Sequence, residues 1–545
     1  MTGSDAMARC LQKEGVEVIF GYTGAAIASF YESLERETQI RQVLVRMEQS
    51  AAHMASGYAR ISGKVGVCSV TSGPGATNLL TGIATAFADS IPLVCITGQV
   101  NSDMIGSDVF QEADIIGAAE SFVKYSYLVR RVQEIPQIFK EAFHIANTGR
   151  KGPVLIDVPQ DVQEAALSRF SYPEEVHLRS YKPTVKGNTV QIRKVITELS
   201  RAERPILCVG GGVFSSGAVE IIRDFAHRFE LPVVSTMMGI GVMPSEDPLY
   251  FGMVGNNGEG IANLAMNDAD LLLMVGARVA DRAVNRPDLI TENKVLVHID
   301  VDPAEIGKNV GPTIPLVGDI AHIFRELLNE ESIAKVPVNH SAWLNDLYND
   351  KSKFKVKTQS SDPAFVEPAA FYDALSRLMD DDAVFVADVG QNQIWSCRYI
   401  RVRSGRFLTS GGMGTMGYAI PAAIGAQMAA PDRQVIAVCG DGGFAMSMAE
   451  LAAMRQEKAG IKIVVLNNRR LGMVREYQHY HLHDSRAMVV LEGEPDLSLL
   501  AKAYDLPYVR IDGKSALDRE LNVFLREHDA AILEVMIDPD ANTPH

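Results

Sequence analysis

The sequence predicts an α/β protein built from three tandem domains, each a doubly wound parallel sheet. Two observations lead to this fold class. Short apolar runs of strand length alternate with helical patterns along the 545 residues, and such alternation is typical of parallel sheets covered by helices. Two polar, irregular stretches, residues 162–190 and 337–367, divide the chain into three parts. A length of roughly 150 residues per domain gives the same number.

Each part contains four apolar runs that we interpret as buried strands. In the first domain, residues 1–165, they are 16–20, 66–70, 92–97 and 153–158. In the second domain, residues 185–335, they are 205–209, 231–235, 270–275 and 295–301. In the third domain, residues 366–545, they are 383–387, 435–439, 461–466 and 531–537. No repeat is visible in the sequence, but the first and third domains could share an architecture.

Composition and charge exclude several classes of protein. The net charge is −15 and no long basic run occurs, which argues against nucleic acid or an anionic membrane surface as a partner. No apolar run reaches the roughly 20 residues of a membrane span. A helix expected directly after Ser4 leaves no signal peptide. The six cysteines are scattered without a CxxC pair, which favours free thiols in a reducing compartment. We therefore expect a cytoplasmic protein.

The stretch 435–468 in the third domain has the features of a site for a metal and an anion. Asp441 follows one apolar strand and Asn468 follows the next, and parallel strands place their carboxyl ends at one edge, where open α/β sheets bind ligands. Carboxylate and amide oxygens suit Mg²⁺. The turn glycines would let backbone approach a bulky anion: Gly440, Gly442 and Gly443. An ordinary βαβ crossover with a glycine-rich turn explains these residues equally well.

The same stretch resembles the cofactor motif of thiamine-diphosphate-dependent enzymes, with 27 positions from Asp441 to Asn468 (468 − 441). Other blocks, in matching order and spacing, are similar to acetohydroxyacid (acetolactate) synthase catalytic subunits: 46–55, 71–78, 110–114, 388–391, 409–418 and 472–474. The chain is therefore identified as a member of this family. The resemblance implies a pyrimidine-binding first domain, a central FAD-type domain and a diphosphate-binding third domain.

The resemblance implies a residue set for thiamine diphosphate and Mg²⁺. Asp441, Asn468 and the backbone carbonyl of Arg470 would hold Mg²⁺ against the diphosphate. Met416 would lie under the bent cofactor, and an unbranched, polarizable side chain suits that place, although a methionine is as often plain core. The remaining cofactor-binding residues would be Gly24, Gln391, Asn392, Gly414, Gly440, Gly442, Gly443 and Met473.

The resemblance also implies catalytic residues. Glu48 would come from a neighbouring subunit and share a proton with the cofactor's pyrimidine, which requires a homo-oligomer, a dimer or a tetramer. Taken alone, Glu48 reads as a solvated residue at a helix start. Gln111 and Phe110 would lie near the reacting centre. Arg282 would bind the second substrate's carboxylate through its guanidinium fork, although a surface ion pair explains it as well. Tyr477 stands where the family has a tryptophan that selects larger second substrates.

The central domain would bind FAD, which has no redox role in joining two 2-ketoacids and would be structural. The glycines that follow its first strand would let backbone approach the flavin nucleotide, although three glycines after a strand are a weak signal. The residues implied for FAD are Arg150, Gly210, Gly211, Gly212, Arg278, Asp300 and Asp319.

The reaction implied is decarboxylation of pyruvate and ligation of the resulting enamine to a second 2-ketoacid, with pyruvate preferred over 2-ketobutyrate. A regulatory subunit is a possible partner. The chain departs from the family pattern at Thr23, Ala25, Met47, Gln160 and Asn392, and it stops short of the tail that often covers the site. Two alternatives therefore stay open. One is a divergent thiamine-dependent C–C lyase or ligase for another ketone or 2-ketoacid, and the other is a non-catalytic cofactor-binding paralogue.

Overall fold

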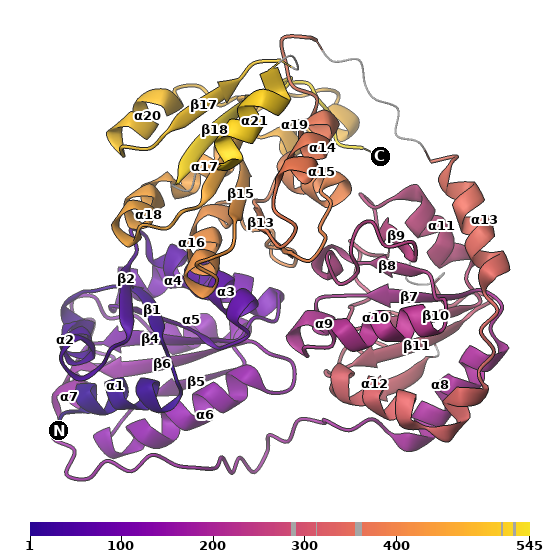
Figure 1. The fold of residues 1–545 in the computed structure, drawn as a ribbon. Coiled ribbons are helices and arrows are strands. Elements are labelled where there is room, and N and C mark those ends of the chain that lie inside the picture. Colours follow the sequence, from indigo (N-terminus) through magenta and orange to yellow (C-terminus); the bar gives the residue numbers. More distant parts are fainter. Residues whose placement is uncertain (285–289, 312, 355–361, 514–515, 527–529, 545) are drawn as a thin grey trace.

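Three parallel sheets of six strands each organise the protein, as a computed structural model shows (Figure 1). The structure describes residues 1–284, 290–311, 313–354, 362–513, 516–526 and 530–544. Buried apolar clusters cover both faces of the sheets, and one of them is shared by the first and third domains. The predicted fold class, three tandem α/β domains with parallel sheets, is confirmed.

The first domain has the strand order β2-β1-β3-β4-β6-β5. Its strands are β1 (Val18–Tyr22), β2 (Arg41–Leu44), β3 (Gly66–Val70), β4 (Leu93–Gln99), β5 (Tyr125–Leu128) and β6 (Pro153–Pro159). Its helices are α1 (Gly3–Lys13), α2 (Ala28–Glu37), α3 (Glu48–Ser62), α4 (Pro74–Ala88), α5 (Ile115–Ala119), α6 (Ile135–Asn147) and α7 (Gln160–Glu164). Every residue of β3, β4 and β6 is buried, as expected for central parallel strands.

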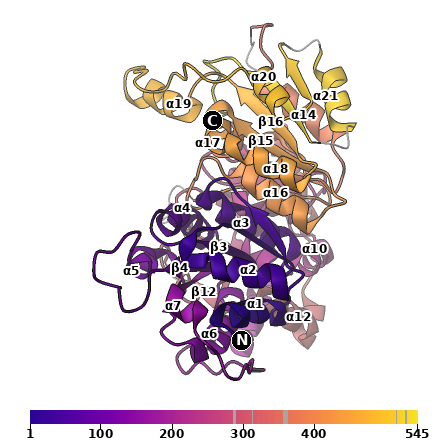
Figure 2. The same ribbon diagram turned by 90° about the vertical axis from the view of Figure 1, so that its left-hand side faces the viewer.

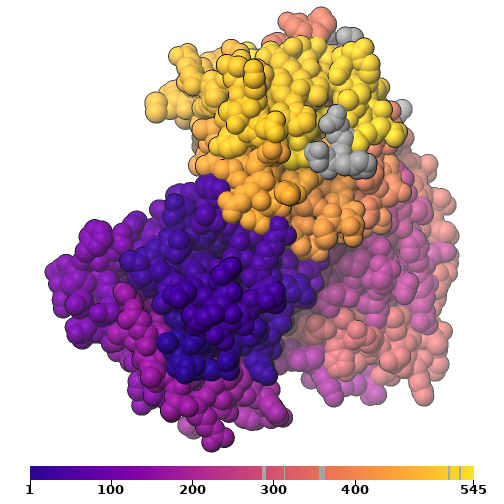
Figure 3. Space-filling view, turned by 60° about the vertical axis from the view of Figure 1, so that its left-hand side comes forward, coloured from indigo at the N-terminus to yellow at the C-terminus, as the bar shows by residue number. Residues whose placement is uncertain are grey.

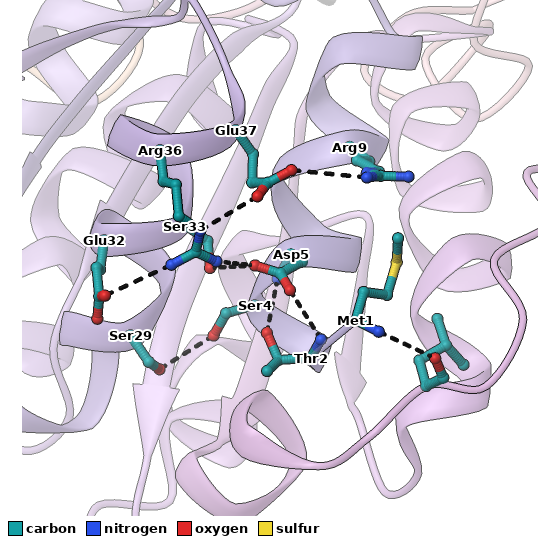
Figure 4. Close-up of polar contacts among 11 residues, drawn as sticks. Met1, Thr2, Ser4, Asp5, Arg9, Ser29, Glu32, Ser33, Arg36 and Glu37 are labelled. Atoms are coloured by element: carbon teal, nitrogen blue, oxygen red, sulfur yellow. Dashed lines mark hydrogen bonds and ion pairs between the residues drawn. The ribbon is translucent and has the colours of Figure 1, made fainter.

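The N-terminal helix is fixed by a capping box and by one buried carboxylate (Figure 4). Thr2 caps α1, two residues earlier than the expected Ser4, because its hydroxyl accepts from the Asp5 amide while the Asp5 carboxylate accepts from the Thr2 amide. Asp5 also accepts a hydrogen bond from the Ser33 hydroxyl at 2.9 Å and pairs with Arg36. Asp5 thereby joins α1 to α2.

The middle domain has the strand order β12-β11-β10-β7-β8-β9, which is the order of dinucleotide-binding sheets. Its strands are β7 (Pro205–Val209), β8 (Val233–Ser235), β9 (Tyr250–Met253), β10 (Leu271–Val275), β11 (Val295–Asp300) and β12 (Ile314–Val317). Its helices are α8 (Thr189–Arg201), α9 (Gly212–Ser215), α10 (Val219–Arg228), α11 (Gly260–Asp268), α12 (Ile320–Asn329) and α13 (Ser341–Lys351).

The third domain repeats the topology of the first, with the order β14-β13-β15-β16-β18-β17. Its strands are β13 (Val384–Ala387), β14 (Arg406–Leu408), β15 (Val435–Gly440), β16 (Lys462–Asn467), β17 (Tyr508–Ile511) and β18 (Ala531–Met536). Its helices are α14 (Pro368–Leu378), α15 (Gln391–Tyr399), α16 (Ala419–Ala429), α17 (Asp441–Ser447), α18 (Leu451–Glu457), α19 (Gly472–His481), α20 (Leu497–Ala503) and α21 (Leu517–Arg526). The architecture that the first and third domains were expected to share is present.

The two stretches expected as linkers differ from each other. After α7, residues 165–188 run to the middle domain without a helix or strand (Figure 1). The stretch 337–367, by contrast, contains α13, whose Trp343 and Leu347 are buried against the middle domain. The Trp343 indole donates to the Pro205 carbonyl at 3.2 Å. Most other positions of α13 are polar, so its pattern resembles a loop. Residues 355–361 of this stretch lie outside the described residues.

The first and third domains contact each other through α3 and α16, and Figure 3 shows the indigo first domain against the orange part of the third. Glycines permit the close approach of the two helices. A Cβ on Gly57 would lie 2.0 Å from the Ala422 carbonyl oxygen, and one on Gly425 would lie 1.8 Å from the Met54 carbonyl oxygen. The two sheets are therefore held in a fixed relation by backbone-to-backbone packing.

A buried carboxylate supports the long loop 100–114 that follows β4. Asp157 of β6 accepts from the Thr97 hydroxyl at 2.7 Å and from the Gln99 amide at 3.0 Å. The same Gln99 amide donates to the Ala113 carbonyl at 2.9 Å. Burial raises the pKa of Asp157 to about 7, against the two hydrogen bonds, which lower it. The base of the loop is thus tied to a group that titrates near neutrality.

We expect Asp157→Asn to flatten the pH dependence of thermal stability. Because the folded-state pKa of about 7 lies above the ordinary aspartate pKa of 3.8, the contribution of Asp157 is fully present below pH 3.8 and is lost as the pH rises through 7. The difference corresponds to about 4 kcal/mol. The unfolding midpoint measured by circular dichroism from pH 5 to pH 8 should fall less in the variant than in the wild type. An equal fall in both proteins would contradict this assignment, and the exposed Asp432→Asn provides the matched control.

Candidate active site

A pocket of about 60 Å³ lies at the carboxyl edge of the third sheet, where the strand order reverses between β13 and β15. This reversal point is where open α/β sheets bind ligands. The pocket is lined by residues that follow β13, β15 and β16, together with Met416. It brings together ten residues predicted for the cofactor or metal: Gln391, Asn392, Met416, Gly440, Asp441, Gly442, Gly443, Asn468, Arg470 and Met473.

Three helices begin at this pocket. The first residues of α15, α17 and α19 are Gln391, Asp441 and Gly472, and all three line it. Helix N-termini present unpaired backbone N–H groups and the positive end of the helix dipole, which favour anions. A ligand with more than one negative charge, such as a diphosphate, fits this arrangement.

Asp441 carries the clearest feature of a cation site. Its Oδ1 accepts from the Gly442 amide at 2.8 Å, whereas its buried Oδ2 has no partner among the described residues. Burial raises the pKa of Asp441 to about 6, although backbone amides lower it. Buried carboxylate oxygens are normally satisfied. An oxygen-seeking cation such as Mg²⁺, which commonly uses one or two carboxylates plus ligand phosphates, fits this buried oxygen.

The Asn468 side chain lies in the same pocket, and its neighbours set its orientation. Its Nδ2 donates to Oε1 of Gln391 at 3.2 Å, and its Oδ1 accepts from the Arg470 amide at 3.1 Å. A Cβ on Gly472, the first residue of α19, would lie 2.0 Å from the Gln391 side-chain oxygen, so a larger residue here would displace the Gln391 side chain from this position. Among the described residues no group of three His, Cys, Asp or Glu side chains could hold a metal. A metal at this edge would therefore depend on Asp441 together with neutral oxygens and its ligand.

Asp388, which the sequence analysis did not assign to the site, supports Met416. It is fully buried at the end of β13 and accepts from the amides of Gly417 and Ala419, both at 2.9 Å. Burial raises the pKa of Asp388 to about 6. These bonds fix the turn before α16, and the Met416 methyl group lies 3.3 Å from where a Gly442 Cβ would be. The only sequence signal was an acidic residue directly after an apolar strand.

The first domain gathers three predicted residues at the equivalent edge of its own sheet. Glu48 begins α3, is half-buried and accepts from the Asn78 amide at 3.1 Å. Thr71 lies in the turn that follows β3, and a Cβ on Gly24 would lie 2.6 Å from it. A Cβ on Gly73 of that turn would lie 2.9 Å from Gln111. Glu48, Gly24 and Gln111 therefore surround one segment, 71–78.

These two edges belong to different sheets. The residues predicted for the cofactor, the metal and catalysis are divided between them. Every residue that lines the 60 Å³ pocket comes from the third domain. The turn before Glu48 is held by the third domain of the same chain, because the Glu450 carboxylate accepts from the amides of Arg46 and Met47 at 3.0 Å. Figure 2 shows α5 of the first domain and α19 of the third on the same side of the molecule.

Four other predicted residues lie at neither cluster. The Phe110 side chain is 87% exposed in the loop 100–114. Tyr477 is 58% exposed on α19 and contacts the His481 ring at a centroid distance of 4.7 Å. Arg282 is exposed beyond β10. Gly414 is also exposed, with φ +70°, a conformation that favours glycine. Their roles in the reaction stay predictions.

The glycines of the middle domain lie where the strand order reverses between β7 and β10. They are required by packing within the chain. A Cβ on Gly210 would lie 2.3 Å from the Gly276 carbonyl oxygen, and one on Gly212 would lie 2.7 Å from the Gly276 Cα. Gly211 is less confined, with Met238 3.1 Å from the corresponding position. The reversal point itself is the place at which a dinucleotide fits this strand order.

The charged residues predicted for FAD also have partners within the chain. Arg150 contacts Asp302 at 3.2 Å and Glu305 at 2.9 Å, and Arg278 donates to the Ala88 carbonyl at 2.9 Å. Asp319 caps α12 by accepting from the His322 amide. Asp300 is buried at the end of β11, and this burial raises its pKa to about 6. A nucleotide bound here would exchange some of these contacts for its own.

We expect Asp441→Asn to weaken Mg²⁺-dependent binding of thiamine diphosphate by at least about tenfold, because it removes the single buried charge that faces the cation. The measurement is a calorimetric titration of thiamine diphosphate at fixed Mg²⁺. The control, Asp432→Asn, alters an exposed carboxylate between α16 and β15. Unchanged affinity in Asp441→Asn would remove this carboxylate from the metal site.

Within the part of the chain that the structure describes, no helix is both long and apolar enough to cross a membrane.

Three family descriptions match the chain in the order of its domains. Residues 1–118 match the thiamine pyrophosphate enzyme N-terminal TPP binding domain. Residues 192–327 match the central domain, and residues 388–535 match the C-terminal TPP binding domain of the same enzymes.

Full-length relatives agree with these matches. The chain is 40% identical to the acetolactate synthase large subunit of Lactococcus lactis, over 98% of this chain and 92% of that protein. It is 40% identical to a probable acetolactate synthase large subunit of Methanocaldococcus jannaschii, over 100% and 93%. It is 38% identical to the acetolactate synthase isozyme 3 large subunit of Escherichia coli, over 99% and 95%. The chain belongs to the family of thiamine-pyrophosphate-dependent acetolactate synthase catalytic subunits.

Proposed function

We propose that this chain is an acetolactate synthase, which decarboxylates pyruvate and joins the remaining two-carbon unit to a second 2-ketoacid. The observation that carries the proposal is the third-domain pocket, in which three helix N-termini surround the unpartnered oxygen of Asp441. The relatives' names agree with this activity over nearly the whole chain. Thiamine diphosphate, when bound, supplies the nucleophilic carbon and the electron sink that decarboxylation needs.

The chain's own residues would bind and orient that cofactor. Asp441, the Asn468 amide oxygen and the Arg470 carbonyl would hold Mg²⁺, and the N-termini of α15, α17 and α19 would bind the diphosphate. Met416, held in place by the turn that Asp388 fixes, would support the cofactor rings. The supporting observation is that these side chains already converge on one pocket.

Glu48 would hold or move a proton at the cofactor's pyrimidine nitrogen, supplied from a second copy of the chain. Two observations support this arrangement. Glu48 is half-buried at the edge of the first sheet, and the pocket lining contains third-domain residues. Apolar side chains are exposed close to both clusters, with Met47 beside Glu48 and Met446 in α17 at 66% exposure. A homodimer, or a tetramer of such dimers, would cover them.

The finer assignments extend this proposal. We take pyruvate to be preferred over 2-ketobutyrate as the second substrate because Tyr477 adds a hydroxyl where the family has tryptophan. Arg282 would bind the carboxylate of that substrate.

FAD would bind at the reversal point of the middle sheet as a structural group, and the flavin absorbance spectrum of purified protein tests this. A cytoplasmic location is supported by six cysteines that are all free and buried. A regulatory subunit is a further possible partner.

The direct test is to identify the products formed from pyruvate with Mg²⁺ and thiamine diphosphate. Acetolactate and CO₂ are expected, and in competition with 2-ketobutyrate the pyruvate-derived product should dominate. Acetaldehyde with CO₂, or turnover of another ketone alone, would support a divergent lyase or ligase instead. No consumption of any 2-ketoacid would favour a non-catalytic paralogue. A strong bias toward acetohydroxybutyrate would reject the preference for pyruvate as the second substrate, but it would not reject the proposed synthase activity.

A mixing experiment tests the divided site. We expect Glu48→Gln and Asp441→Asn to lose most activity separately. Because half of randomly formed dimers would be hybrids with one intact site, unfolding and refolding an equal mixture should restore about a quarter of wild-type activity. Each variant refolded alone is the control. If the mixture stays as inactive as its components, Glu48 and Asp441 act within one chain. Full activity of Glu48→Gln refolded alone would instead remove Glu48 from the mechanism.

A further inference from the structure

The segment after the last strand contacts two helices that begin at the diphosphate pocket. Beyond β18, the chain turns at Asp538, whose carbonyl accepts from the Ala541 amide at 3.0 Å. Residues 541–543, which we call the clamp segment, then contact α15 and α19. Both of these helices begin at the pocket.

On α19, two neighbouring side chains hold the clamp segment. The Arg475 guanidinium donates to the Asn542 side chain at 2.7 Å and also to the Ala541 carbonyl. The Glu476 carboxylate accepts from the Thr543 hydroxyl at 2.8 Å and from the Thr543 amide at 3.1 Å. Arg475, Glu476 and Thr543 are all buried, so each of these bonds replaces hydration that the groups have lost.

On α15, the contact passes through Gln391. Its Nε2 donates to Oε2 of Glu476 and to the Ala541 carbonyl, both at 2.8 Å. The Trp395 indole adds a longer bond of 3.4 Å to the Asn542 carbonyl. Both hydrogens of the Gln391 amide are thus donated. One goes to the Ala541 carbonyl of the clamp segment, and the other goes to Glu476, which Thr543 of that segment contacts. The Gln391 oxygen is left to face Asn468.

The direction of these hydrogen bonds determines whether Asn468 turns its side-chain oxygen or its side-chain nitrogen toward the pocket. Glu476 and the Ala541 carbonyl can only accept, so Gln391 must turn its nitrogen toward them and its oxygen toward Asn468. Asn468 must then donate its nitrogen to Gln391. Its oxygen is directed to the side where the Arg470 amide also donates. A reversed Gln391 would permit a reversed Asn468, which would offer an N–H group that cannot bind a cation.

We propose that the clamp segment, through Glu476 and Gln391, positions Asn468 as an oxygen ligand, so that its docking is thermodynamically coupled to binding of Mg²⁺ and a diphosphate. Glu476 is a positioning residue that lies behind the pocket wall. The inference rests on the proposed metal–diphosphate site. By linkage, whatever loosens the clamp segment weakens metal binding, and bound metal tightens the clamp segment by the same factor.

Binding measurements test the first half of this coupling. Thr543→Val removes the hydroxyl donor at nearly constant shape, and Glu476→Gln places an amide nitrogen against either the Thr543 amide or Gln391. Each should raise the apparent Kd for Mg²⁺, measured at fixed thiamine diphosphate, by about tenfold. Thr543→Ser should keep the wild-type value. Asp540→Asn is the matched control, because Asp540 is an exposed neighbour whose ion pair is with Arg486 at 3.2 Å.

A positioning role differs from general damage in two readouts. The unfolding midpoint of each variant without ligand should stay near that of the wild type, and excess Mg²⁺ should restore full cofactor binding. The second half of the coupling is read by hydrogen exchange. Deuterium uptake in a peptide that covers 538–544 should slow several-fold in the wild type when Mg²⁺ and thiamine diphosphate are added, and the slowing should be smaller in Thr543→Val.

The outcomes separate the two claims. If the wild type does not bind thiamine diphosphate with Mg²⁺, the proposed site and the coupling are both rejected. If the wild type binds it but Thr543→Val and Glu476→Gln bind Mg²⁺ within about twofold of the wild type, the coupling alone is rejected. Uptake in 538–544 that does not respond to the ligand would also overturn the coupling.

Discussion

The reversal of strand order between β13 and β15 is the constraint on which the site depends. At a reversal the connecting helices leave on opposite faces, so a space opens at the carboxyl edge that neither helix fills. Here three helix N-termini meet at that space, with the buried Asp441 among them. The positive ends of the helices favour an anion, whereas the unpaired carboxylate oxygen of Asp441 favours a cation. A metal–diphosphate satisfies both, because it presents anionic oxygens to the helices and a cation to Asp441.

The first sheet has the same order of strands as the third but carries different chemistry at its edge. Where the third domain has glycines and Asp441, the first has Glu48 with Asn78 beside it. Close packing of α3 on α16 through Gly57 and Gly425 fixes the two sheets in one chain. A site that uses both edges, as proposed above, would therefore take its second half from another copy of the chain, and one topology used twice would then form a single catalytic centre in an oligomer.

The central part of each sheet was predictable, and the edges were not. All twelve strands expected from apolar runs are present, and the six others, β2, β5, β9, β12, β14 and β17, are the two edge strands of each sheet. Central parallel strands are buried on both faces and read as continuous apolar runs. An edge strand such as β5 is exposed or half-buried throughout, so its sequence resembles a loop.

The candidate site shows the same division. Asp441, Asn468 and the glycines follow apolar strands directly, so the strand pattern places them at one edge. Glu476 and Thr543 are 67 residues apart, and their hydrogen bonds follow only from the path of the chain after β18. Asp388 was missed because its role is to hold backbone amides, which leave no pattern in a sequence. Residues whose partners are backbone or distant in the chain are thus the ones that sequence patterns do not reveal.

The most direct measurement of the central claim is a crystal structure of the protein with thiamine diphosphate and Mn²⁺ in place of Mg²⁺, in which anomalous scattering locates the metal. We expect a single peak within about 2.5 Å of Oδ2 of Asp441 and of the Asn468 side-chain oxygen, next to the diphosphate. A metal bound elsewhere, or a diphosphate away from the N-termini of α15, α17 and α19, would contradict it.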